Sequence, residues 1–138
     1  IVESKTNLLR VIHYPPLDGN EKDGAIRGAA HEDINLITVL VAGTQPGLQV
    51  KDTNDSWHDI SCDPGCLAIN TGDMLQEASA GYFPSTTHQI INPRDSIENV
   101  SRFSMPLFLH PRDSIKLAEK YTAREYLDER LNEIGLKG

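Results

Sequence analysis

The sequence predicts an all-β fold, a sandwich or jelly roll that carries a helix at its C-terminal end. Short β-branched or alternating segments recur up to about residue 112 and are separated by Gly, Pro, Asn and Asp, which is typical of antiparallel strands joined by turns. From Asp113 onward the apolar residues follow a helical period instead. With 138 residues the chain has the size of one domain.

The first predicted strand covers residues 8–14 and stops at Pro15, because proline lacks the backbone N–H of a strand ladder. Residues 17–30 are polar and glycine-rich, which is typical of a loop. A β-branched run then predicts a buried strand over residues 31–41. A hairpin is expected next, with strands over 48–51 and 56–60 joined by an Asp-Thr-Asn-Asp turn.

The second half of the chain continues this pattern. We expect a strand over residues 67–70, about one turn of helix over 74–78 that ends by Gly81, and a strand over 88–92. A longer strand is expected over 101–109, where Pro106 indicates an edge or a bulge.

The last predicted element is a helix that ends near Ile134. Its start is marked by Thr122-Ala123-Arg124-Glu125, a capping box, and Gly135 is suited to terminate it. No internal repeat or low-complexity segment is visible.

The composition argues against two classes of binding partner. A net charge of −7 argues against a nucleic-acid groove or an anionic membrane surface. No apolar run approaches the ~20 residues of a membrane span, and no signal peptide is visible. We therefore expect an intracellular, cytoplasmic protein. Cys62 and Cys66 are interpreted as free thiols beside a Pro-Gly turn, because a structural zinc site needs four ligands and no second pair exists.

Three residues have the chemistry of a metal site. His31 and Asp33 open the β-branched run, and on a strand their side chains would share one face, roughly 7 Å apart. An imidazole and a carboxylate are two of the three ligands that hold non-haem Fe(II), and the third is a histidine. His88 is the best candidate, because it opens a later strand that can face His31. Asn70 or Gln89 could fix the imidazole tautomers.

Arg102 and Ser104 form a second pair on one strand face. A planar guanidinium beside a hydroxyl suits the capture of a carboxylate. His13, His58 and His110 are interpreted as structural or solvent-exposed.

With these residues in this order, the sequence resembles the iron(II)/2-oxoglutarate-dependent dioxygenases of the isopenicillin N synthase-like group. The resemblance runs from about Leu9 to Arg112. It is carried by these stretches: Arg10–Pro16, His31–Asp33 with the apolar run behind it, Pro46–Val50, Asn70–Gln76, Pro84–His88 and Arg102–Leu109.

The resemblance implies a double-stranded β-helix in which His31, Asp33 and His88 bind Fe(II). Arg102 and Ser104 would hold the far carboxylate of 2-oxoglutarate, with the hydroxyl of Tyr14 as a helper. The implied activity is hydroxylation or desaturation of a small organic substrate by dioxygen, coupled to decarboxylation of 2-oxoglutarate to succinate. Residues 1–112 would form this core, and residues 113–138 a C-terminal helical segment.

The sequence differs from the family in two respects, and two alternative functions are also compatible with it. Gln89 is neutral where family members usually carry a basic residue, and the family's N-terminal half is missing. Self-association, or pairing with that missing part, is therefore expected. The alternatives are an isopenicillin N synthase-type oxidase that does not use 2-oxoglutarate, and a truncated, non-catalytic metal-binding module.

Overall fold

The structure, a computed structural model, describes residues 1–138 except residues 2, 62, 95–97 and 137–138. Its elements in chain order are β1 (Leu8–Leu9), β2 (Ile12–Tyr14), β3 (Gly28–His31), β4 (Ile37–Val41), β5 (Leu48–Lys51), β6 (Trp57–Asp59), β7 (Leu67–Thr71), α1 (Asp73–Ala78), β8 (His88–Ile90), β9 (Arg102–Ser104), β10 (Pro106–Leu109) and α2 (Ala123–Glu133). The all-β fold class with a C-terminal helix is confirmed.

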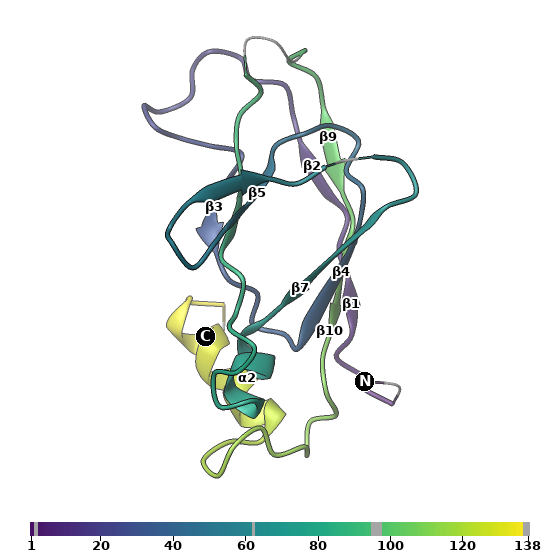
Figure 1. Cartoon of the computed structure of the whole chain (residues 1–138), viewed down its shortest axis with the longest axis vertical. Coiled ribbons are helices and arrows are strands. Elements are labelled where there is room, and N and C mark those ends of the chain that lie inside the picture. The colour runs from purple at the N-terminus through teal and green to yellow at the C-terminus, as the bar shows by residue number, and fades with distance from the viewer. Residues whose placement is uncertain (2, 62, 95–97, 137–138) are drawn as a thin grey trace.

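The strands form two four-stranded antiparallel sheets and one two-stranded ladder. The first sheet has the order β1-β10-β4-β7, the second has the order β3-β8-β5-β6, and β2 pairs with β9. In Figure 1 the second sheet, labelled by β3 and β5, lies on the opposite side of the interior from β4, β10 and β1, and α2 lies at the lower end. The inner faces of the sheets enclose the site described below.

Two long predicted strands are each divided in the structure. The strand expected over 8–14 is β1 plus β2, and the strand expected over 101–109 is β9 plus β10. Pro106 is the reason, because it has no N–H and stands where the chain passes from the β2–β9 ladder into the first sheet. Arg10 N donates to Pro106 O at 3.0 Å at the matching break between β1 and β2. Of the edge or bulge predicted at Pro106, the edge was wrong, since β10 pairs with both β1 and β4. The irregularity is instead the break at Met105 between β9 and β10.

The strand expected over 31–41 was also wrong in its extent. β3 begins at Gly28, inside the predicted loop, and ends at His31, and β4 begins only at Ile37. Between them the chain leaves the second sheet and enters the first. The carbonyl groups of Asp33, Asn35 and Leu36 accept hydrogen bonds from Asp73, Met74 and Gly72 instead of from a neighbouring strand.

The C-terminal helix begins as predicted. Thr122 is its N-cap, its side chain accepts from Glu125 N, and the Glu125 carboxylate accepts from Thr122 N, so the capping box is confirmed. α2 packs through Ala123 on Met74 of α1 and on Leu117. The two helices of the described chain have 6 and 11 residues, too few for a helix that crosses a membrane.

Much of the described interior is polar. Asp33, Asn35, Thr38, Arg102 and Ser104 are all buried. Buried polar groups are costly unless they are hydrogen-bonded, and so many of them between two sheets indicate a site rather than a core.

Candidate metal centre

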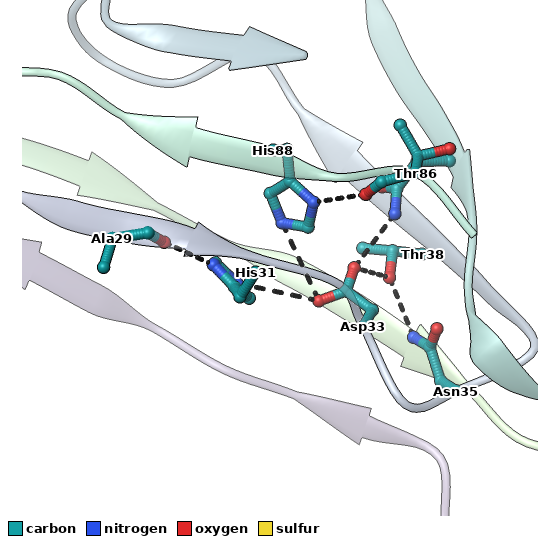
Figure 2. A network of polar contacts seen from close by, with 8 residues as sticks. Ala29, His31, Asp33, Asn35, Thr38, Thr86 and His88 are labelled. Atoms are coloured by element: carbon teal, nitrogen blue, oxygen red, sulfur yellow. Dashed lines mark hydrogen bonds and ion pairs between the residues drawn. The ribbon is translucent and has the colours of Figure 1, made fainter. Parts of the chain in front are cut away.

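His31, His88 and Asp33 come together at the end of the second sheet. His31 closes β3 and His88 opens β8, and the two are direct partners across these neighbouring antiparallel strands, with ring centroids 4.4 Å apart. His31 Nε2 lies 4.0 Å and His88 Nε2 lies 3.8 Å from Asp33 Oδ1. Figure 2 shows the three side chains pointing toward one another. No other group of three such side chains was found among the residues that the structure describes.

Asp33 reaches this position from a loop, not from the strand that carries His31. The sequence argument that alternation on one strand brings the two together was therefore wrong, although the two residues do meet. The loop is held by α1, whose first N–H groups bind its carbonyl groups: Asp73 N donates to Asp33 O at 2.8 Å and Met74 N to Asn35 O at 3.1 Å. Orphan N–H groups at the start of a helix are suited to this task.

Both imidazole rings are fixed by backbone carbonyl groups. Nδ1 of His31 lies 2.8 Å from Ala29 O, and Nδ1 of His88 lies 2.9 Å from Thr86 O. A carbonyl oxygen can only accept, so each Nδ1 donates its proton to the backbone, and each Nε2 lies toward Asp33 (Figure 2). In the neutral ring this Nε2 carries the lone pair that binds a metal. The prediction that Asn70 or Gln89 holds the imidazoles was wrong. Gln89 donates to Gln49 Oε1 at 2.8 Å, outside the triad.

The Asp33 carboxylate is held through one oxygen only. Thr38 Oγ1 donates to Oδ2 at 2.5 Å and Asn70 Nδ2 donates to the same oxygen at 3.0 Å. Asn35 Nδ2 donates to Thr38 Oγ1 at 2.8 Å, so the hydroxyl proton is directed to the carboxylate. Oδ1 is left facing the two Nε2 atoms. Asn70 therefore orients the carboxylate, and Asn35 and Thr38 are functional residues that the sequence reasoning missed.

These groups fit a divalent transition metal. Asp33 is 7% exposed, and the basic side chains that lie within 4.0 Å of its carboxylate among the described residues are the two imidazoles, with no Lys or Arg. A buried carboxylate without a compensating cation is costly. Protein ligand atoms lie about 2 Å from such a metal, so one ion can span the measured separations. Two imidazoles and one carboxylate are the ligand set of non-haem Fe(II) with open positions.

A large cavity opens from the triad between the sheets. It has a volume of about 1080 Å³, and its lining includes His31, Asp33, His88, Tyr14 and Ser104. The His31 side chain is 53% exposed, which leaves one side of the centre open to solvent and ligands. α2 also contributes lining residues, Leu127 and Leu131 among them. The triad is therefore accessible to a small molecule.

The predicted carboxylate clamp lies on the β2–β9 ladder. Arg102 and Ser104 are 1% and 5% exposed and pair with Tyr14 and Ile12. Arg102 Nε donates to Gln45 O at 3.0 Å, and its guanidinium carbon lies 5.5 Å from the centre of the Tyr14 ring. The side chain lines a smaller pocket of about 180 Å³ that shares Leu40 and Leu48 with the large cavity. The structure thus places Arg102 against Tyr14 beside the small pocket, whereas Tyr14 and Ser104 line the large cavity.

Comparison with known proteins gives the family. Residues 5–111 match the model of the 2OG-Fe(II) oxygenase superfamily. A flavonol synthase/flavanone 3-hydroxylase of Petunia hybrida is 35% identical over 105 residues, which are 75% of this chain and 28% of the relative.

Two solved structures support the same assignment. A protein from Shewanella oneidensis described as an oxygenase has 59% identity and a TM-score of 0.85, over 99% of this chain and 50% of that one. A full-length protein of Neurospora crassa, solved in complex with alpha-KG, has 26% identity and a TM-score of 0.80, over 93% of this chain and 44% of that one. The chain thus spans about half the length of these solved proteins and 28% of the length of the Petunia hybrida enzyme. It belongs to the 2OG-Fe(II) oxygenase superfamily.

Proposed function

We propose that the chain is the catalytic core of an Fe(II)- and 2-oxoglutarate-dependent oxygenase that hydroxylates or desaturates a small organic substrate. The observation that carries the proposal is the convergence of His31 Nε2, His88 Nε2 and Asp33 Oδ1, each with its other polar atom occupied. The ion would be held on one side by these residues, with its other positions open to the cavity. When bound, Fe(II) supplies the activation of dioxygen, which is coupled to decarboxylation of 2-oxoglutarate to succinate.

Arg102, Ser104 and Tyr14 are proposed to bind the far carboxylate of 2-oxoglutarate. The burial of Arg102 and Ser104 supports this role, because a guanidinium in a low-dielectric site binds a carboxylate more strongly than an exposed one does. Gly43 also supports it: a Cβ there would lie 2.8 Å from an Arg102 guanidinium nitrogen, so the glycine leaves the room that the side chain needs.

The proposed division is a core over residues 1–112 and a C-terminal helical segment over residues 113–138. β10, the last strand, ends at Leu109 and α2 begins at Ala123, which supports a boundary between them. Because Leu127 and Leu131 line the cavity, the C-terminal segment is expected to contribute to substrate binding.

An anaerobic titration tests the function. Adding Fe(II) and then 2-oxoglutarate is expected to give the visible charge-transfer absorption of a chelated keto acid. His31→Ala should abolish the band and Arg102→Ala should weaken it, whereas His58→Ala, which removes an exposed histidine bonded to Asp52, should leave it unchanged. Iron binding without a band would refute the role of 2-oxoglutarate and favour the oxidase that does not use it. Failure to bind iron would refute the metal centre.

We also propose that the outward face of the first sheet is covered in the working protein by polypeptide equivalent to the other half of its solved relatives. One apolar row runs across all four strands of this sheet. Its members are register partners: Leu9, Leu107, Val39 and Ile69. Leu9 and Ile69 are 61% and 67% exposed, and contiguous exposed apolar patches of this kind mark interaction sites.

This partner proposal is tested by the oligomeric state. Co-expression with the unmatched half of the Shewanella oneidensis chain should give a one-to-one complex, and Ile69→Lys should weaken it. A chain that remains monomeric and does not bind that segment would refute the proposal, and a stable homodimer would show that a second copy covers the face instead.

We infer a cytoplasmic location, which the exposed free thiol of Cys66 supports, because thiols persist in reducing compartments. Cys62, interpreted from the sequence as a second free thiol, lies outside the described residues. Cell fractionation tests the location, and recovery in an oxidising compartment would refute it.

A further inference from the structure

The cavity has a second polar region, on the wall formed by β1, β2 and β10. Along the N-terminal strands every second residue faces inward, and Leu8, Arg10, Ile12 and Tyr14 all line the cavity. Arg10 lies in the break between β1 and β2, where its backbone N–H binds Pro106 O. Its side chain thus enters the same cavity as the triad.

The Arg10 side chain forms no ion pair or hydrogen bond with another residue that the structure describes. The sequence has seven more acidic than basic side chains, so carboxylates are abundant. Arg124 and Arg130, for comparison, each pair with a carboxylate of α2. A cation that faces a cavity without a partner is suited to bind an anionic ligand.

His110 is a second, independent observation on the same wall. The residue is 9% exposed, it lines the cavity, and its Nδ1 is buried without a hydrogen-bond partner among the described residues. Its backbone is fixed, because its N–H donates to Asn7 Oδ1 at 2.9 Å. Burial lowers the pKa of His110 and so disfavours the charged ring. Buried polar atoms are normally satisfied, so an unpaired one in a residue that lines a cavity indicates a group that binds there.

The register places these two residues relative to the metal centre. Arg10 bonds to Pro106 at the start of β10, and His110 follows Leu109 at its end, so they stand on either side of Phe108, each roughly 7 Å away along the strand. Phe108 pairs with Leu8 on one side and with Thr38 on the other. Thr38 binds the Asp33 carboxylate. An apolar surface therefore lies between the metal triad and the two polar side chains.

We propose that Arg10 and His110 form a substrate anchor that selects an organic acid with an apolar body. Arg10 binds the carboxylate of the substrate, Leu8 and Phe108 contact its apolar body, and His110 Nδ1 makes a hydrogen bond to a further polar group. The anchor rests on the proposed function, since it holds the substrate of that same centre.

The test uses aryl-alkanoic acids of increasing chain length, each compared with its own primary amide. Binding is followed by calorimetry and, in the presence of Fe(II) and 2-oxoglutarate, by the change in the charge-transfer band. At least one acid should bind about ten- to hundredfold more tightly than its amide, as expected for a hydrogen bond to a charged group. Arg10→Gln should remove this preference, and His110→Phe should weaken acid and amide alike.

Arg112→Gln is the matched control, because Arg112 is exposed and pairs with Glu3 rather than lining the cavity. It should keep the preference for the acid. A panel in which no acid binds more tightly than its amide would overturn the anchor while leaving the proposed function intact. If the charge-transfer band is absent but calorimetry still shows a preference for acids, the proposed function is refuted and the anchor is not.

Discussion

Gly72 has no room for a side chain, and this gives the sharpest prediction. Its φ of −113° is ordinary for any residue, so the constraint is space and not backbone conformation. A Cβ at this position would lie 2.3 Å from Asn35 O, 2.4 Å from Asn35 Oδ1 and 2.7 Å from Asp33 O. Since carbon and oxygen normally approach to about 3.3 Å, Gly72→Ala must push the loop that carries Asp33 by about 1 Å.

The cost can be estimated from the bonds that hold this loop. Gly72 N, Asp73 N and Met74 N donate to Leu36 O, Asp33 O and Asn35 O at 3.1, 2.8 and 3.1 Å. Losing three hydrogen bonds of about 1 kcal/mol each, together with about 1–3 kcal/mol for overpacking, lowers the free energy of unfolding by about 4–6 kcal/mol. Displacement of Asp33 should also lower metal affinity by about 10- to 100-fold.

The assay compares two alanine variants. Urea unfolding followed by Trp57 fluorescence gives the stability, and titration with Co(II), which resists oxidation, gives the metal affinity. Gly65→Ala is the control, because nothing lies within 4 Å of a Cβ there although its φ is +86°. It should cost about 1 kcal/mol through backbone strain and leave metal binding unchanged. A Gly72→Ala variant that is no less stable than Gly65→Ala, with normal Co(II) affinity, would refute the reasoning.

Three further predictions concern the same region. Thr38→Val removes one of two donors to Asp33 Oδ2 and should lower Co(II) affinity about tenfold, with rescue by Thr38→Ser; equal affinity in the three proteins would contradict it. Burial raises the pKa of Asp73, so the folded state holds this proton more tightly than the unfolded state does. Ionisation of Asp73 therefore lowers the free energy of unfolding as the pH rises from the ordinary carboxyl pKa through the raised one. Asp73→Asn should therefore stabilise the fold at pH 7 but not at pH 3, as urea unfolding at both values would show. Fe(II) at about 100 times its Kd should raise the free energy of unfolding by about 2.7 kcal/mol, an increase that His88→Ala should abolish in anaerobic thermal unfolding; the same increase in that variant would count against the triad.

Much of the architecture follows from local sequence. Alternating segments and turn residues predict most strands because a strand and its turn are set by neighbouring residues. The capping box of Thr122 and Glu125 is equally local, and it begins α2 as expected. The triad of His31, Asp33 and His88 is also found from the sequence, because a resemblance that covers most of the chain identifies the residues without their geometry.

Contacts between distant segments decide the rest. Asp33 lies in a loop held by Gly72–Met74, nearly forty residues later, so strand alternation gives the right residues for the wrong reason. Partners of His31 and His88 are backbone carbonyls, which no side-chain pattern reveals. The contacts of Asn35 and Thr38, and the roles proposed for Arg10 and His110, arise only when two sheets face each other across the cavity. A sequence specifies which groups are present, whereas burial and long-range pairing determine which of them lack a partner and can bind a ligand.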